Sequence, residues 1–241
     1  GITAVIQSSS ATTVMVVGFV NAGLLSLTQA VGVIMGANIG TTVTSLMLSV
    51  KLDFGMIFAC LGLALSILPK KHPTARAFGE VLMGLGILFV GMNTMSGAME
   101  PLRDWQLFRE AMTSINNPLL GVLIGAGITA ILQSSSASVG ILQALAGEGL
   151  ISLHASIYIL FGQNIGTCVT ALLASSGTNA TAKRAAMVHL LFNVLGTILF
   201  MIISLTLPFA DWVISLSPDN RRLQIAIVHV IFNVTTTAVL L

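Results

Sequence analysis

The stretch Gly127-Ile-Thr-Ala-Ile-Leu-Gln133-Ser134-Ser135-Ser136-Ala137-Ser138 is polar in its second half and is flanked by apolar sequence. A second copy, Gly1-Ile-Thr-Ala-Val-Ile-Gln7-Ser8-Ser9-Ser10-Ala11-Thr12, occurs at an offset of 126 residues. Self-similarity at a fixed offset indicates a duplicated structural unit. The sequence therefore predicts a fold built from two related halves.

Composition places the chain in a membrane. Of its 241 residues, 55% are hydrophobic and only 7% are charged, with a mean hydropathy of +0.98, whereas a soluble domain is about one-quarter charged. Near-continuous apolar runs long enough to cross a bilayer as helices predict an all-α polytopic protein of the cell membrane, inner or plasma. The formal charge of +2 gives no support to a nucleic-acid partner, and Cys60 and Cys168 both lie in apolar segments, where small buried thiols are expected.

The two halves can be bounded from the repeat. Residues 118–147 match the opening segment, and 150–175 match 24–49 without a gap. We expect a first repeat over 1–99, an interfacial amphipathic helix over 100–117 and a second repeat over 118–241. The sequence that precedes the motif in the second copy has no counterpart before Gly1, so the first repeat is expected to be truncated at its N-terminus.

Arm length predicts that each Gln-Ser-Ser-Ser phrase lies at the tip of a re-entrant helical hairpin. Each arm within 118–147 has about 14 residues, or about 21 Å of helix, which is too short for a hydrocarbon core of roughly 30 Å. Three spans then separate the hairpins (25–50, 54–68 and 78–99), and an odd count makes the repeats inverted. If each hairpin were one continuous crossing instead, the repeats would run parallel. Inverted repeats with discontinuous helices are typical of secondary transporters.

The serine-rich tips have the chemistry of an anion site. Serine hydroxyls and backbone N–H groups at the start of a helix can hold an oxyanion without arginine. The structural alternative is that these hydroxyls only bond back to their own helix carbonyls. Matched pairs at a fixed offset favour a functional site.

A second phrase, also duplicated, has the chemistry of a cation site. It reads Gly36-Ala-Asn38-Ile-Gly40-Thr41-Thr-Val-Thr44 in the first half and Gly162-Gln-Asn164-Ile-Gly166-Thr167-Cys-Val-Thr170 in the second. Glycines permit unwinding in mid-span, and the freed carbonyls with Asn and Thr oxygens would form a neutral cage that suits sodium. The sequence therefore predicts two broken transmembrane helices.

Two later spans share a phrase that contains an intramembrane histidine. His189 is followed by Asn193, and His229 by Asn233, four residues on. Such histidines are candidates for function. They are equally well explained by hydrogen bonds between helices, so we expect them at most behind the residues that contact substrate.

The duplicated Gln-Ser-Ser-Ser and Gly-x-Asn-Ile-Gly-Thr phrases closely resemble those of the bacterial sodium-dependent phosphate cotransporters, relatives of the animal type II family. The resemblance implies sodium-coupled import of inorganic phosphate, with no cofactor besides the coupling sodium ions. The matching phosphate-binding positions are Gln7, Ser8, Ser9, Ser10, Gln133, Ser134, Ser135 and Ser136. The matching sodium-binding positions are Gln7, Ser8, Asn38, Thr41, Thr44, Gln133, Ser134, Asn164, Thr167 and Thr170.

Other functions fit the sequence less well. Transport of another small oxyanion uses the same groups and stays open, as does assembly into a homodimer. An intramembrane serine hydrolase with His189 or His229 as base would need one privileged serine, but the serines are duplicated and no Gly-x-Ser-x-Gly elbow is present. We therefore expect a transporter rather than an enzyme.

Overall fold

The computed structural model describes residues 1–50, 54–68, 71–107, 110 and 117–241, and every regular element in these ranges is helical. In chain order the helices are α1 (Ile2–Ile6), α2 (Ser9–Asn21), α3 (Leu27–Ser49), α4 (Gly55–Ser66), α5 (Pro73–Met99), the 3-10 turn η1 (Glu100–Arg103), α7 (Pro118–Leu132), α8 (Ser135–Gly147), α9 (Leu153–Gly166), α10 (Cys168–Ala174), α11 (Ala180–Thr206), α12 (Phe209–Leu216) and α13 (Arg221–Leu240). The all-α class is confirmed.

Five stretches of helix in the described ranges are long and apolar enough to cross a bilayer: α3, α5, α9 with α10, α11 and α13. This is the architecture of a multi-pass membrane protein. The short helix α12 was not predicted; it starts after Pro208, which follows the C-terminal end of α11.

Both Gln-Ser-Ser-Ser phrases form the tip of a helical hairpin. Gln7 and Gln133 end α1 and α7 in the left-handed conformation, with φ of 59° and 53°, and they are the non-glycine residues with positive φ in the described chain. Ser8 and Ser134 then cap α2 and α8, accepting hydrogen bonds from the backbone N–H groups of Ala11 and Ala137 at 3.1 and 3.3 Å. The same turn is therefore built twice.

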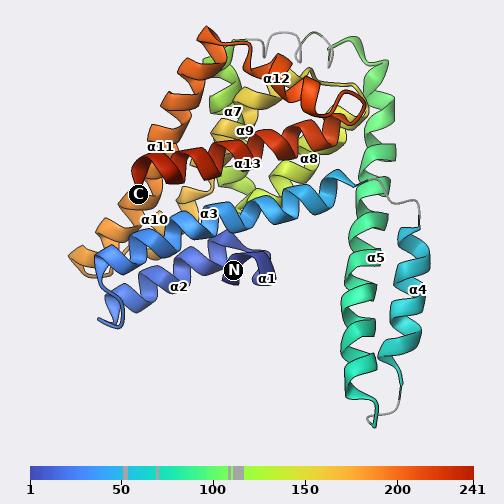
Figure 1. The fold of residues 1–241 in the computed structure, drawn as a ribbon, viewed down its shortest axis with the longest axis horizontal. Helices are drawn as coiled ribbons and strands as arrows, with labels where there is room; N and C mark the ends of the chain where they lie inside the picture. Colours follow the sequence, from blue (N-terminus) through green and yellow to red (C-terminus); the bar gives the residue numbers. More distant parts are fainter. Residues whose placement is uncertain (51–53, 69–70, 108–109, 111–116) are drawn as a thin grey trace.

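The hairpins point toward each other. Figure 1 shows α7 and α8 in the upper part of the molecule and α1 and α2 below them. Helices α2 and α8 have 13 residues each and α7 has 15, about 20 to 23 Å, which confirms the predicted arm lengths. Helix α4 has only 12 residues, about 18 Å, so counting spans does not by itself decide the topology. The re-entrant path through a bilayer stays a prediction.

The prediction of two broken helices is wrong for α3. Its counterpart in the second half, α9 with α10, is interrupted at a single residue only. Helix α3 runs unbroken from Leu27 to Ser49 through the whole glycine phrase. In the second half α9 and α10 are separated only at Thr167, whose φ of −59° and ψ of −26° are helical. No stretch of unwound backbone lies at either place.

Gly40 and Gly166 serve close packing instead of unwinding. A Cβ added to Gly40 would lie 2.7 Å from the Cβ of Thr3, and one added to Gly166 would lie 2.8 Å from the Cβ of Thr129. These two contacts are equivalent in the two halves. Each first hairpin arm therefore packs directly on the backbone of the long helix, and this contact requires glycine.

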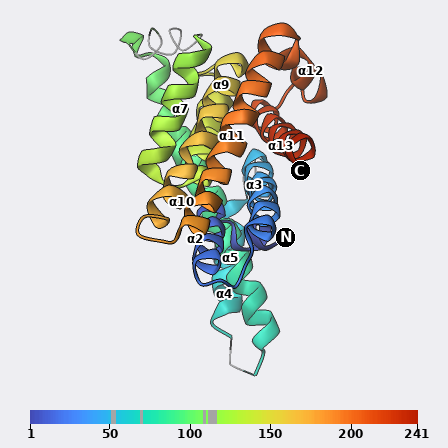
Figure 2. The same cartoon turned by 90° about the vertical axis from the view of Figure 1, so that its left-hand side faces the viewer.

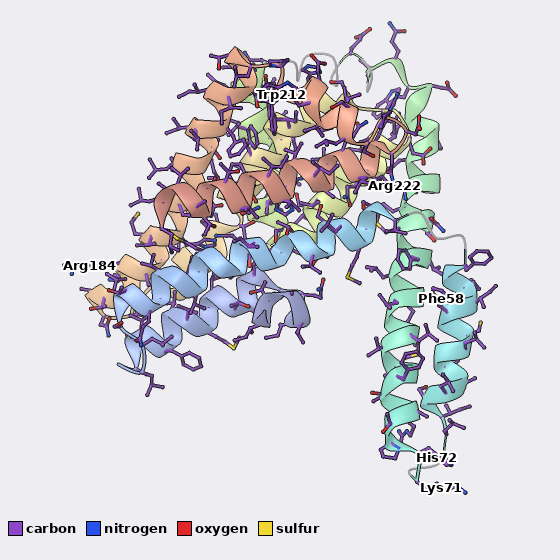
Figure 3. The ribbon with its side chains drawn as sticks, viewed as in Figure 1. Phe58, Lys71, His72, Arg184, Trp212 and Arg222 are labelled. Atoms are coloured by element: carbon purple, nitrogen blue, oxygen red, sulfur yellow. The ribbon has the colours of Figure 1, made fainter. Side chains whose placement is uncertain are left out.

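Helices α4 and α5 form a pair that extends away from the other helices (Figures 1 and 2). Lys71 and His72 lie at its far end, and α5 contacts the main body through α8 (Figure 3). The main body is centred on α3, α9, α11 and α13, and its largest apolar cluster contains Phe161, Phe200 and Phe232, with ring centroids 5.2 to 5.9 Å apart.

The predicted interfacial helix over 100–117 is described only in part. The described part consists of η1, a non-helical break at residues 104–105 and helical residues 106–107, and residue 110 is also described. Residues 108–109 and 111–116 lie outside the described residues.

Candidate functional site: the meeting point of the two hairpins

The two hairpin tips meet at one pair of serines. Ser9 Oγ and Ser135 Oγ lie 3.3 Å apart, within hydrogen-bond distance, and both side chains are buried. The residues are 126 positions apart, which is the offset of the repeat. The contact therefore joins equivalent atoms of the two halves.

This meeting brings two helix N-termini together. Ser9 and Ser135 are the first residues of α2 and α8, each 13 residues long. A helix N-terminus carries about half a positive charge on its unpaired N–H groups, so two that face each other at close range repel. An anion between them would turn this repulsion into attraction, because oxyanions accept hydrogen bonds from such groups.

The flanking serines divide into two roles. Ser8 and Ser134 use their oxygens to cap α2 and α8, so only their hydroxyl hydrogens remain to donate. Ser10 and Ser136 are half-buried one residue beyond the central pair. Together the tips supply hydroxyl donors from both halves, the arrangement expected for an oxyanion.

The two glutamines are not equivalent. Gln7 Oε1 accepts a hydrogen bond from Thr44 Oγ1 at 2.5 Å, and its Nε2 donates to the carbonyl of Ala4. This contact ties the first tip to α3. Gln133 is exposed, and the hydroxyl of Thr170, the counterpart of Thr44, donates to the carbonyl of Thr167 instead. The structure therefore joins Gln7 and Thr44 by a hydrogen bond, and none of the described hydrogen bonds joins Gln133 and Thr170.

The remaining predicted sodium-binding threonines bond to their own helices. Thr41 donates to the carbonyl of Ala37 at 3.1 Å, and Thr167 donates to the carbonyl of Gln163 at 2.9 Å. This is the back-bonding expected of a purely structural threonine. Since the hydrogen is used, each oxygen presents lone pairs outward, and a cation could still bind there.

The two asparagines of the glycine phrase are buried next to other polar groups. Asn38 Oδ1 lies 3.2 Å from His189 Nε2, which places His189 directly behind a predicted site residue. The Nδ2 groups of Asn38 and Asn164 are both buried without a hydrogen-bond partner. His189 Nε2 contacts Asn38 Oδ1, whereas Asn38 Nδ2 is an unpaired donor.

The asparagines of the two histidine phrases form equivalent hydrogen bonds within their own helices. Asn193 Nδ2 donates to the carbonyl of His189, and Asn233 Nδ2 donates to the carbonyl of His229, both at 2.9 Å. Asn193 Nδ2 also reaches Cys168 Sγ at 3.3 Å. Of these four residues, only His189 has a hydrogen bond to a predicted site residue among the described contacts.

Sequence reasoning missed the residues that hold each hairpin closed. Thr3 Oγ1 donates to Thr12 Oγ1 at 3.1 Å, and Thr129 Oγ1 donates to Ser138 Oγ at 2.8 Å. Each bond joins the two arms of one hairpin, and the two bonds are equivalent. All four residues lie within the duplicated phrase, so its conservation between the halves could have identified them.

A buried arginine was also missed. Arg222 is 7% exposed, and its Nη2 donates to Ser96 Oγ at 2.7 Å and lies 3.9 Å from Glu148 Oε1. Figure 3 shows it where α13 comes close to α5. The contact with Ser96 depends on tertiary packing, and no local pattern indicates it.

Comparison with known proteins identifies the family of this chain. The family model described as Na+/Pi-cotransporter matches residues 1–97 and 100–216. A Bacillus subtilis (strain 168) protein described as "Uncharacterized protein YqeW" is 36% identical over 244 residues, which cover 99% of this chain and 77% of that protein. No solved structure matches the chain.

Two further relatives carry functional descriptions. The Escherichia coli (strain K12) "Putative inorganic phosphate export protein YjbB" is 31% identical over 254 residues, covering 100% of this chain and 44% of that protein. The human "Sodium-dependent phosphate transport protein 2C" is 43% identical over 94 residues, covering 37% of this chain and 16% of that protein. The chain thus spans less than half the length of the YjbB protein. From the family match over nearly its whole length, the chain belongs to the Na+/Pi-cotransporter family.

Proposed function

We propose that the protein is a sodium-coupled transporter that imports inorganic phosphate across the cell membrane. The contact between Ser9 and Ser135 is the observation that supports this most directly, because it joins two helix N-termini and their hydroxyl groups at one point between the two halves. Such a point favours a small oxyanion. Membership of a cotransporter family agrees with a transport role rather than an enzymatic one.

In this proposal residues 1–99 and 118–241 are the two repeats, and each supplies half of the site. Phosphate accepts hydrogen bonds from the tip serines and the glutamines. Sodium is held by neutral oxygens near Gln7 and Thr44, with the matching positions of the second half, and no other cofactor is needed. The unpaired Nδ2 groups of Asn38 and Asn164 would serve the anion better than the cation, since they can only donate.

Sodium coupling would act through the Gln7 side chain. Its Oε1 accepts a hydrogen bond from Thr44 Oγ1, so one group connects the anion-binding tip to α3. A sodium ion that coordinates these oxygens would fix the tip and raise phosphate affinity. Coupling of this kind is reciprocal, so phosphate must raise sodium affinity by the same factor.

Uptake of radiolabelled phosphate into proteoliposomes tests the proposal. We expect uptake to require an inward sodium gradient, and Ser9→Ala or Ser135→Ala to reduce it by at least tenfold, while the exposed Ser215→Ala on α12 leaves it unchanged. Full uptake in potassium would refute sodium coupling. Stronger inhibition by sulfate than by arsenate would indicate a different oxyanion.

Outward movement is the second candidate, because the YjbB relatives are described as export proteins. Vesicles preloaded with phosphate separate the two directions. If transport is coupled to sodium, phosphate efflux should exceed phosphate uptake when the sodium gradient is reversed. Phosphate efflux without any sodium gradient would favour export.

A further inference from the structure

A polar cavity lies where the end of α8 meets the start of α13, and none of the hairpin-tip residues line it. It has a volume of about 360 Å³ and is lined by Gly147, Glu148, Asp219, Asn220, Arg221 and Arg222. We call it the α8–α13 pocket. Its lining carries two basic and two acidic side chains, so positive and negative charge are balanced within one small space.

Arg222 has unused hydrogen-bond donors at this pocket. The side chain is 7% exposed, and a guanidinium group has five N–H donors. In the described contacts only Nη2 donates, to Ser96 Oγ at 2.7 Å, and the nearest oxygen of Glu148 lies 3.9 Å away, beyond the length of a hydrogen bond. Buried charges in proteins are normally fully hydrogen-bonded. The remaining donors on Nε and Nη1 therefore favour an oxyanion in the pocket.

Both arginines lie over glycines at the end of α8. A Cβ added to Gly147 would lie 2.5 Å from Arg222 Nε, and one added to Gly149 would lie 2.8 Å from Arg221 Nη1. The two glycines are two residues apart, so their Cα atoms are at most about 7.6 Å from each other. The two guanidinium groups therefore lie against the same turn, and together they can bind the oxygens of one phosphate group.

Asp219 and Arg221 line the same pocket without pairing. Both are exposed, and neither side chain has a hydrogen bond or an ion pair among the contacts that the structure describes. Opposite charges that line one cavity and do not bond to each other can both be satisfied by a ligand that carries both signs of charge. A ligand with negative charge only would be repelled by Asp219.

The pocket lies at the end of two candidate membrane spans. Helix α13 begins at Arg221, and the span formed by α9 and α10 begins at Leu153, shortly after Glu148. The ends of spans lie at the level of the lipid headgroups. Trp212 on α12, which contacts α13, is half exposed, as is typical of an indole at that level, and Figure 3 shows it in the upper half of the molecule with Arg222. A phospholipid headgroup is therefore a zwitterion within reach of this pocket.

We propose that the α8–α13 pocket binds the phosphoethanolamine headgroup of a membrane phospholipid. Arg221 and Arg222 hold the phosphate diester, and Asp219 accepts hydrogen bonds from the primary ammonium group. A choline headgroup has no N–H to donate, and a glycerol headgroup has no positive charge to place beside Asp219, so both fit less well. The volume is in the range of small-ligand sites. The site does not depend on phosphate transport or on sodium coupling.

Native mass spectrometry of the purified full-length protein in detergent tests the site. The probes are dioleoyl phosphatidylethanolamine, dioleoyl phosphatidylcholine and dioleoyl phosphatidylglycerol, each titrated separately. We expect the ethanolamine lipid to bind about tenfold more tightly than the other two. Glycerophosphoethanolamine, which is the headgroup without acyl chains, should displace this lipid, whereas inorganic phosphate at the same concentration should not.

Two substitutions separate the two halves of the headgroup. Asp219→Asn removes the partner of the ammonium, so the preference for the ethanolamine lipid over the choline lipid should disappear. Arg221→Gln removes a partner of the phosphate and should weaken the binding of both lipids by about tenfold. The same changes at exposed positions outside the pocket, Asp211→Asn and Arg184→Gln, are the controls and should bind as the wild type does. Because the two lipids are compared on one variant, their ratio does not depend on a change in stability.

Each outcome decides the proposal. Equal binding of the three lipids to the wild type overturns it, as does an unchanged preference and affinity in both Asp219→Asn and Arg221→Gln. Tighter binding of the glycerol lipid would indicate a site for anionic lipids and would also overturn it. Displacement of the lipid by inorganic phosphate as effectively as by glycerophosphoethanolamine would make the occupant a free oxyanion instead of a headgroup.

Discussion

Thr129 and Ser138 join the two arms of the second hairpin through a buried hydrogen bond of 2.8 Å between their hydroxyl groups. The first hairpin has the same bond between Thr3 and Thr12. Each bond joins two short helices of one hairpin, so it helps to hold the tip where the opposite tip meets it.

Thr129→Val should loosen the second hairpin. The substitution keeps the shape of the side chain but leaves the buried Ser138 hydroxyl without its donor, which costs about 1 kcal/mol. We expect a lower unfolding midpoint in a denaturing-detergent titration and weaker phosphate uptake. Thr94→Val on the exposed face of α5 is the control, and an equal loss there would show that the arm-to-arm bond has no special role.

Gly40→Ala should disturb the first hairpin, because its new methyl group would lie 2.7 Å from Thr3 Cβ. Overpacking of this kind costs about 1 to 3 kcal/mol. Gly36→Ala, one turn earlier on the same helix, has no neighbouring atom within 4 Å and should be tolerated. Phosphate uptake and melting temperature of the two variants are compared. If both lose uptake equally, the glycine phrase acts through unwinding after all.

Thr44→Val should weaken sodium activation. It removes the hydroxyl that donates to Gln7 Oε1, so the first tip loses its tie to α3. We expect the sodium concentration for half-maximal uptake to rise about tenfold, a change of about 1.4 kcal/mol. Thr170→Val, the equivalent change in the second half, removes only a bond to the carbonyl of Thr167 just before α10 and should have a smaller effect. Equal shifts would mean that the two halves bind sodium symmetrically.

Arg222→Met should destabilise the junction of α5, α8 and α13. It removes the hydrogen bond to Ser96 and the ion pair with Glu148, and a buried hydrogen bond to a charged group contributes about 2 kcal/mol. The neighbouring Arg221 is exposed, so Arg221→Met is a control with the same change in charge. Hydrogen exchange of α5 should increase in the first variant only; unchanged exchange would show that α5 is held by other contacts.

Much of the architecture could be predicted because it depends on local sequence. Apolar length indicated the spans, and the Ser8 and Ser134 caps follow from the preference for serine at helix N-termini. The glycine phrase misled because glycine has two uses in membrane helices, unwinding and close packing, and the choice depends on whether another backbone approaches. The close contacts that α1 and α7 make with Gly40, Gly162 and Gly166 show that packing is the use here.

The sequence by itself determined the membrane class, the duplication at 126 residues and the serine turns, because these depend on composition and on short-range backbone preferences. Tertiary structure alone decided that Ser9 meets Ser135, that Gln7 bonds to Thr44, and that Arg222 is buried against Ser96. These contacts join residues far apart in the chain. Their geometry follows from how whole helices pack, which no local pattern specifies.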